Sequence, residues 1–182
     1  MGKGFTLLEL LIVIGILAIL ATVVALVLNP AELLRQARDA QRLSDLRTIN
    51  SAIGLWVASA SSTTMTATST CTSGTTGYGP NATTCVANSN TGISGSGWVN
   101  INFTYIPGGS PLSRLPLDPA NGTTYYYQFV NDIANLTYEL NANMESDKYK
   151  SGGAADIESN TKDGGDNNNV YEIGTRPGLN LI

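Results

Sequence analysis

Residues 4–28 read GFTLLELLIVIGILAILATVVALVL, and this stretch decides the fold of the N-terminal part of the chain. From Phe5 to Leu28 its one charged residue is Glu9. A helix rises about 1.5 Å per residue and the hydrocarbon core of a bilayer is about 30 Å thick, so roughly 20 apolar residues cross it. The stretch therefore predicts a transmembrane helix. A carboxylate inside such a helix costs about 2.5–3.5 kcal/mol by insertion measurements, so Glu9 needs a partner.

The flanks of the apolar stretch distinguish it from an ordinary secretory signal peptide. Such a peptide has a shorter apolar core that ends at a small-residue cleavage site, and no such site follows Leu28. Lys3 precedes the apolar run and several arginines follow it, so loop charge alone leaves the orientation open. The cysteines and the polar C-terminal part favour an outside location for the residues after the helix.

A second helical segment follows a break at Asn29-Pro30, where proline removes a backbone donor. Its apolar residues recur at three- and four-residue spacing, which predicts one apolar face in need of a packing partner. This stripe comprises Leu34, Ala37, Leu43, Leu46, Ile49, Ile53, Trp56 and Val57. We expect one long helix from residue 5 to about residue 58, kinked near the proline.

The charged residues of the second segment fall largely off this stripe. Arg35 and Asp39 are spaced as an i,i+4 pair, and Arg42 and Asp45 as an i,i+3 pair. Two interpretations stay open: a solvated helix face, or ion pairs between the subunits of a packed assembly.

The segment GFTLLELLIVIGILAIL (residues 4–20) closely resembles the N-terminus of type IV pilins and of type II secretion pseudopilins. The segment RDAQRLSDLRTINSAI (residues 38–53) is similar to the helix sequence of the same superfamily. There, a membrane aspartic peptidase cuts a short leader after a glycine, and the new N-terminal residue is methylated. The resemblance implies a cut between Gly4 and Phe5, methylation of Phe5, and an assembly role for Glu9.

The amine that this cut leaves on Phe5 gives Glu9 a partner. A neighbouring helix shifted along its axis can bring its amine to Glu9, and an ion pair recovers much of what burying either charge costs. Glu9 then favours one stagger of neighbouring helices, as a buried polar residue does in a coiled coil. The alternative is a plain membrane anchor in which Glu9 reaches the lipid headgroups. The chain departs from the family in its short leader with one lysine, and in its cysteines, which follow the long helix directly.

Composition excludes several classes of function. The formal net charge is −4, with 10 basic and 14 acidic residues, which argues against nucleic acid as a partner. The chain has no histidine, and no motif places a nucleophile beside a base, so we expect a protein that is not an enzyme and requires no cofactor. Cys71 and Cys85 make no CxxC pair and lie in a polar segment, so a disulfide in an oxidising compartment is expected, with two unrelated thiols as the alternative.

The C-terminal half carries alternating, β-branched and aromatic segments. Strands are predicted at residues 98–106, 123–130 and 136–142, and a short one at VYEIG (170–174). NDIAN (131–135) joins two of them as a hairpin, and LPLDPANG (115–122) is a turn-rich connection. The expected fold is α+β, in which a small antiparallel sheet packs on the apolar face of the long helix from Leu43 to Val57. Pilins share this arrangement.

The predicted organisation has five parts, the third being the amphipathic half of the long helix. They are a leader (1–4), a transmembrane and assembly helix (5–30), the amphipathic part (31–58), a Ser/Thr-rich loop region with a disulfide (59–97), and the sheet with a polar C-terminal loop (98–182). Glycosylation sequons begin at Asn81, Asn102, Asn121 and Asn135.

A calcium site is a further possibility in the C-terminal loop. The oxygens of Asp163, Asp166 and Asn168 suit a hard cation. Major pseudopilins are similar in having a calcium loop near the C-terminus. An ordinary solvated loop is the alternative, because the spacing is not that of an EF-hand.

Two kinds of function fit these features. The first is a structural subunit of a type IV pilus-like filament or, alternatively, the major pseudopilin of a type II secretion system. Its partners would be copies of itself, the prepilin peptidase and the assembly machinery, first in the cytoplasmic membrane and then in an extracellular filament. The second is a membrane-anchored monomeric binding domain or enzyme.

Overall fold

The computed structural model describes residues 4–62, 65–66, 68–74, 76–78 and 84–181. The chain divides into two compact units, unit 1 from Met1 to Arg35 and unit 2 from Gln36 to Ile182. Each unit is described by itself.

Unit 1 contains helix α1 (Leu7–Leu28) and the first turns of helix α2 (Pro30–Ser59). Asn29 lies between the two helices. Its left-handed conformation, with φ of 39°, ends α1, and its side-chain oxygen accepts the backbone N–H of Glu32 at 3.4 Å, which caps the start of α2. Pro30 occupies the first position of α2, where a missing N–H costs nothing. The predicted interruption at Asn29-Pro30 is therefore confirmed, and its physical basis is a cap followed by an N1 proline.

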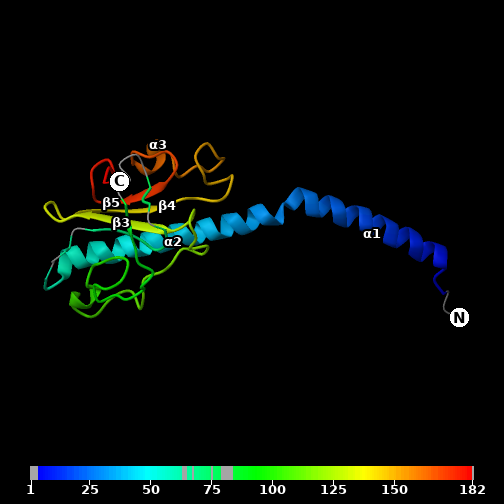
Figure 1. Cartoon of the computed structure of the whole chain (residues 1–182). Coiled ribbons are helices and arrows are strands. Elements are labelled where there is room, and N and C mark those ends of the chain that lie inside the picture. The colour runs from blue at the N-terminus through cyan, green and yellow to red at the C-terminus, as the bar shows by residue number, and fades with distance from the viewer. Residues whose placement is uncertain (1–3, 63–64, 67, 75, 79–83, 182) are drawn as a thin grey trace. The chain divides into compact units, whose positions relative to one another are not determined.

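Unit 2 is a five-stranded sheet with α2 along one face and the short helix α3 (Asn160–Asp163) on the other (Figure 1). The strands are β1 (Ser69–Cys71), β2 (Val86–Ala87), β3 (Tyr127–Asp132), β4 (Thr137–Ala142) and β5 (Tyr171–Gly174). Their order is β2-β1-β3-β4-β5; β1 and β2 are parallel and all other neighbours are antiparallel. The α+β prediction is confirmed.

The core lies between α2 and the sheet. One face of α2, which includes Leu46, Ile49, Ile53 and Trp56, is fully buried against side chains of β3, β4 and β5. Because side chains alternate along a strand, the other sheet face carries a second, smaller cluster around the cysteines. That cluster comprises Cys71, Tyr78, Cys85, Tyr126, Val130 and Val170.

The predicted strands agree with β3, β4 and β5 within a few residues at each end, but residues 98–106 are not a strand. Backbone N–H groups there bond to a neighbouring loop, as Trp98 does to the carbonyl of Asn90 and Phe103 to that of Ile93. The Asn102 side chain then accepts the N–H of Thr104 and starts the 3-10 helix η1 (Phe103–Tyr105). The β-rich composition of this segment reflects burial of its apolar side chains rather than pairing in the sheet.

Strands β1 and β2 lie in the Ser/Thr-rich region and were not predicted. They are three and two residues long, too short for a recognisable alternation. Residues 69–71 form strand β1 because they pair with β3 in the tertiary structure, where Thr70 lies opposite Phe129.

Candidate functional site

The N-terminal end of α1 is built around Thr6 and Glu9. The Thr6 hydroxyl accepts the backbone N–H of Glu9 at 3.2 Å. In return, one Glu9 carboxylate oxygen accepts the backbone N–H of Thr6 at 2.9 Å and its hydroxyl at 2.8 Å. This reciprocal arrangement is a capping box, which satisfies two N–H groups that helix geometry leaves unpaired.

The capping box explains part of the role of Glu9 within a single chain. Its signal, a threonine followed three residues later by a glutamate, is present in the sequence but was missed. Among the described residues Glu9 makes no ion pair, so its charge remains available to a group outside the chain. Phe5, next to the predicted cleavage point, is 84% exposed, and Gly4 has open space around it.

Helix α1 carries apolar side chains on all sides and buries none of its most apolar window within the described structure. By length and composition it belongs to the one helix of the described residues that can cross a membrane. Burying apolar surface is worth roughly 25 cal/mol per Å². The helix therefore requires lipid or other helices as its environment.

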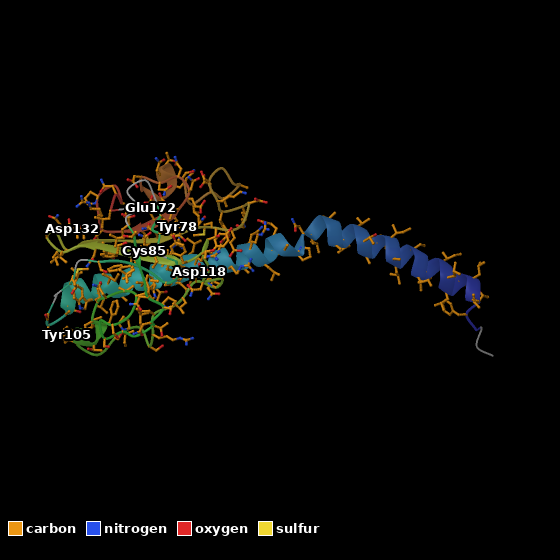
Figure 2. All side chains as sticks on the ribbon, viewed as in Figure 1. Tyr78, Cys85, Tyr105, Asp118, Asp132 and Glu172 are labelled. Carbon is orange, nitrogen blue, oxygen red and sulfur yellow. A yellow bond between two sulfur atoms is a disulfide. The ribbon has the colours of Figure 1, made fainter. Side chains whose placement is uncertain are left out.

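Unit 2 holds a buried charge cluster on α2, centred on Arg42. The guanidinium binds Asp118 through Nε at 2.6 Å and Nη2 at 2.9 Å, Asp39 through Nη1 at 2.7 Å, and Glu145 through Nη2 at 2.5 Å. Asp118 is labelled in Figure 2, beside α2. The side chain of Arg42 is fully buried, and its guanidinium carbon lies 5.0 Å from the centroid of the Tyr125 ring.

The cluster ties two loops to the helix. Asp39 accepts the backbone N–H groups of Glu145 at 3.0 Å and Ser146 at 2.8 Å. Arg38 also donates hydrogen bonds to the Glu145 carboxylate through Nε and Nη2. The loop after β4 and the loop that carries Asp118 are thereby both fixed to one stretch of α2.

The electrostatics of the cluster follow from these contacts. Burial by itself lowers the pKa of Arg42, but the three carboxylates outweigh that effect and raise the pKa above its usual value. Burial raises the pKa of Glu145, and hydrogen bonds from Arg38 and Arg42 outweigh it, so the net pKa is lowered. Both shifts favour the charged forms of Arg42 and Glu145.

The predicted solvated face of α2 is wrong at this cluster. Asp39 and Arg42 are completely buried. The predicted pairs of Arg35 with Asp39 and of Arg42 with Asp45 are not among the ion pairs of the described residues. Arg35 instead lies 3.8 Å from Glu32, and Asp45 accepts the hydroxyl of Tyr127. Asp39 and Arg42 have their partners within the chain, and pairing between subunits by the other charges of α2 stays a prediction. The sequence contained a signal for this burial. One face of the helix carries the buried positions 39, 42, 46, 49, 53 and 56, and the first two of these are charged.

Comparison with known proteins concerns the N-terminus. Residues 2–25 match a family model described as the prokaryotic N-terminal methylation motif. The chain begins with the class III signal peptide of type IV pilins and pseudopilins. This signal peptide implies processing by a prepilin peptidase and assembly by a pilus or secretion machinery. Neither a curated protein nor a solved structure matched the chain.

The signal peptide and α1 together are consistent with insertion of a pilin-like precursor into the membrane. The residues that the family model matches include Gly4, Phe5 and Glu9, the three positions to which the resemblance to pilins assigned roles. Unit 2 lies outside the matched residues, so its structure has to be interpreted from its own contacts.

The disulfide between Cys71 and Cys85 is present, with Cα atoms 5.7 Å apart. It joins the last residue of β1 to the residue before β2, and Cys71 lies opposite Ala87 in the parallel pair. A bridge that closes a loop of roughly 15 residues contributes about 3 kcal/mol in the chain-entropy model. The bridge thus secures the two shortest strands at the edge of the sheet.

The residues proposed for calcium do not converge in the structure. Both oxygens of Asp163 accept backbone N–H groups, from Gly165 and from Glu172, and the Asn168 oxygen accepts the N–H of Asn160. Asp166 is exposed. No group of three or more acidic, cysteine or histidine side chains in the described part of the chain is arranged to hold a metal. The calcium site stays a prediction.

A buried carboxyl pair lies close to this loop and was not predicted. Glu139 on β4 and Glu172 on β5, the latter labelled in Figure 2, are 0% and 1% exposed and lie close enough for the charge of one to act on the other. Burial, with the neighbouring Glu139 charge, raises the pKa of Glu172 to about 8. Two adjacent buried carboxyls cannot both ionise at low cost, so the pair retains a proton at neutral pH.

The sequons differ in their surroundings. Asn102 is occupied as the cap of η1, and the Asn121 side-chain oxygen is buried. Asn135 is exposed in the loop between β3 and β4, where its amide donates to Asp132 at 2.7 Å. Asn81 lies outside the described residues. Glycosylation at each of them stays a prediction.

Proposed function

We propose that this chain is the structural subunit of a type IV pilus-like filament that polymerises through α1. The observation that carries this proposal is the combination, in one helix, of the matched signal peptide, exposed apolar side chains and a Glu9 that has no ion-pair partner among the described residues. A plain membrane anchor needs the apolar helix and can use Glu9 in the capping box, but it supplies no partner for the charge of Glu9.

The proposed assembly begins with removal of residues 1–4 and methylation of Phe5. The mature chain waits in the cytoplasmic membrane, where lipid covers α1. In the filament, α1 helices of other copies replace the lipid, and the Phe5 amine of one copy pairs with Glu9 of its neighbour. Because an unpaired charge in this environment costs several kcal/mol, the pairing selects one register of neighbouring subunits.

An extracellular pilus is the first choice within this proposal. The Ser/Thr-rich tract and the sequons favour a filament exposed at the cell surface. The major pseudopilin of a type II secretion system is the second candidate, favoured by DPANGTTYYY (residues 118–127) and the aspartate-rich tail. In both cases we infer a role that is structural rather than enzymatic, requires no cofactor and involves no nucleic acid.

The test is the mass and the physical state of the mature subunit. Material sheared from cells that produce the protein should pellet as a polymer, and its subunit should lack MGKG and carry one extra methyl on Phe5. A subunit that begins at Met1 or Gly2 would contradict the processing step. A correctly processed chain that remains entirely with the membrane fraction would instead support the anchored monomer.

A further inference from the structure

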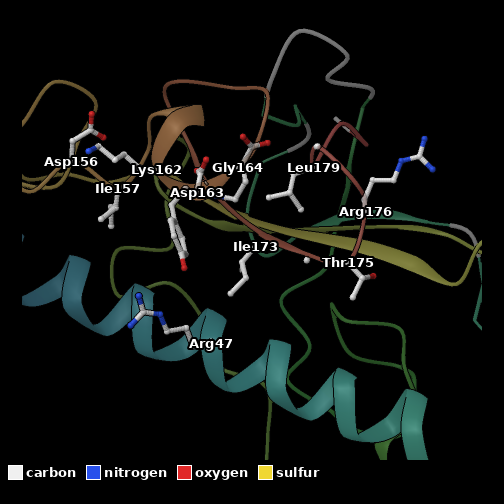
Figure 3. Close-up of a pocket in the computed structure, with 14 residues that line it drawn as sticks. Arg47, Asp156, Ile157, Lys162, Asp163, Gly164, Ile173, Thr175, Arg176 and Leu179 are labelled. Carbon is white, nitrogen blue, oxygen red and sulfur yellow. Dashed lines mark hydrogen bonds between the residues drawn. The ribbon is translucent and has the colours of Figure 1, made fainter.

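The hollow between α2 and β5 in unit 2, about 610 Å³ in volume, selects no ligand by charge (Figure 3). Its lining carries as many cations as carboxylates, namely Arg47, Lys162, Arg176, Asp156, Asp163 and Glu172. The start of α1 is more informative, because the matched signal peptide already specifies a reaction there. The signal peptide implies processing by a prepilin peptidase, and the resemblance to pilins places the cut between Gly4 and Phe5.

The bond between Gly4 and Phe5 lies in extended chain just ahead of α1. Residues 4–6 are not helical, and Thr6 has the extended backbone angles φ −82° and ψ 151°. Gly4 has open space around it, and Phe5 is 84% exposed. In the cut, water adds to the Gly4 carbonyl carbon and the C–N bond breaks. The water supplies the hydroxyl of the new Gly4 carboxyl group and the proton that the Phe5 amine takes.

Thr6 is the residue that stops the helix short of this bond. In a helix that continued towards the N-terminus, the N–H of Glu9 would donate to the carbonyl of Phe5. In the structure this N–H donates instead to the Thr6 hydroxyl, at 3.2 Å. The N–H of Leu10 donates to the Thr6 carbonyl at 3.2 Å, so regular helix bonding begins at Thr6. The capping box therefore sets the first residue of α1.

A helix extended by one turn would hinder the cut. The carbonyl of Gly4 would then accept the N–H of Leu8, and the side chains of the added turn would surround the bond. An α-helix leaves its first N–H groups without helical partners wherever it begins, and a cap fixes that beginning at one residue. Without the cap, the apolar run that favours helix after Thr6 has no fixed start, and the helix can include the bond.

We propose that Thr6 is a positioning residue for removal of the leader: by capping α1, it keeps the bond between Gly4 and Phe5 in the extended conformation that the peptidase binds. The inference rests on the processing step of the proposed function and needs no second copy of the chain. Both bonds that Thr6 donates end on the same Glu9 oxygen, which leaves the other carboxylate oxygen for the assembly contact. Processing and assembly therefore do not compete for Glu9.

The experiment measures steady-state cleavage of the full chain by a purified prepilin peptidase in detergent micelles, followed by intact mass. Substitutions at residue 6 separate capping from shape, because serine and asparagine cap a helix whereas alanine and valine do not, although valine has the shape of threonine. Thr6→Ala and Thr6→Val should raise KM about two- to fivefold at unchanged kcat, since a smaller fraction of the chain is extended. Thr6→Ser and Thr6→Asn should keep the KM of the parent chain.

Thr22→Ala is the matched control on the same helix. The Thr22 hydroxyl donates to the carbonyl of Ile19 at 2.8 Å, far from the helix start, so its loss should leave KM unchanged. The ¹³C chemical shifts of Gly4 and Phe5 in the uncleaved chain give a second measurement. They should move towards helical values in Thr6→Ala and keep their extended values in Thr6→Asn.

Three outcomes would overturn the inference. The first is an unchanged KM for Thr6→Val. The second is a raised KM for Thr6→Asn although its chemical shifts stay extended, because the peptidase would then recognise the threonine side chain itself. The third is a loss confined to kcat, which would assign Thr6 to the chemical step. Failure of the parent chain to be cut after Gly4 would instead contradict the processing step of the proposed function, so the two failures are distinguishable.

Discussion

Helix α1 and the part of α2 in unit 2 have opposite relations between composition and burial. Helix α1 is almost wholly apolar, yet none of its most apolar window is buried within the chain. Helix α2 is rich in charge, yet Asp39 and Arg42 are completely buried in the interior of unit 2. The comparison teaches that burial depends on available partners. Helix α1 has no packing partner among the residues that the structure describes, whereas α2 meets carboxylates supplied by distant loops.

Glu9→Gln is expected to produce the largest effect, on the α1 side of this comparison. Glutamine also serves at this position of a capping box, so the helix start is preserved while the charge is removed. If the Phe5 amine of a neighbour pairs with Glu9, the mutant leaves that amine buried alone, at a cost of about 3–5 kcal/mol. The yield of sheared filaments should fall roughly a hundredfold or more, while the membrane fraction keeps a normal amount of subunit.

The matched control for this experiment is Thr6→Ala, which removes the cap but keeps the carboxylate. Its cost should be about 1 kcal/mol, the usual value for a lost N-cap. Normal filament yield from Glu9→Gln would show that Glu9 acts in the capping box alone, and α1 would then need only an apolar environment.

Arg42→Met tests the α2 side. The substitution removes the cation and leaves Asp39, Asp118 and Glu145 facing one another in the interior. Removing one partner from a buried ion pair costs about 3–5 kcal/mol. Chemical denaturation should show a loss of that size for unit 2, and the same change at the exposed Arg47 should cost less than about 0.5 kcal/mol. Equal stability of the two variants would mean that the cluster is not stabilising.

A pair of leucine substitutions sharpens the comparison of apolar residues. Leu46 on α2 is fully buried, whereas Leu17 on α1 is 57% exposed. Leu46→Ala should lower the unfolding free energy of unit 2 by about 2–5 kcal/mol, as for other buried leucines. Leu17→Ala should leave that free energy unchanged in a denaturation experiment that monitors the tryptophans of unit 2. A similar loss for Leu17→Ala would show that α1 stabilises unit 2.

A last effect is expected from pH, through the carboxyl pair of unit 2. The pKa of Glu172 is raised in the folded chain from its ordinary 4.5 to about 8. The folded state therefore holds a proton that the unfolded state releases, and this contribution to stability is complete below pH 4.5 and lost as pH rises towards 8. Melting temperature should fall between pH 5 and pH 8, and Glu172→Gln should reduce that fall. A slope that is unchanged in the mutant would contradict the assignment.

The sequence predicted the parts of the fold that depend on local patterns. The apolar run of α1, the proline after Asn29 and the strands β3 and β4 all have short-range signals, and each was located within a few residues. What could not be predicted depends on distant partners. Strand β1 exists because β3 lies beside it. The apolar side chains Trp98, Ile101 and Phe103 are buried outside the sheet, and a neighbouring loop supplies backbone hydrogen bonds to this segment.

The functional residues divide in the same way. Gly4, Phe5 and Glu9 follow from a contiguous motif, and the two cysteines from their placement in a polar segment. The pair of Glu139 and Glu172 had no sequence signal, because 33 positions separate two residues that only the register of β4 and β5 brings together. Asp39 and Arg42 could have been recognised as members of the buried stripe, but their partners could not.

The Arg42 cluster also sets the order in which the chain can fold. Asp118 and Glu145 lie 76 and 103 residues after Arg42 along the chain. Helix α2 can form early, with Asp39 as its only local partner for Arg42, but its charged end cannot enter the interior until both loops have arrived. Contacts of such long sequence separation slow folding, because the chain loses the entropy of closing the loops before the contacts form and offset that loss. Completion of unit 2 is thereby delayed until the loop after β4 has been synthesised, and until then the charged end of α2 remains in water.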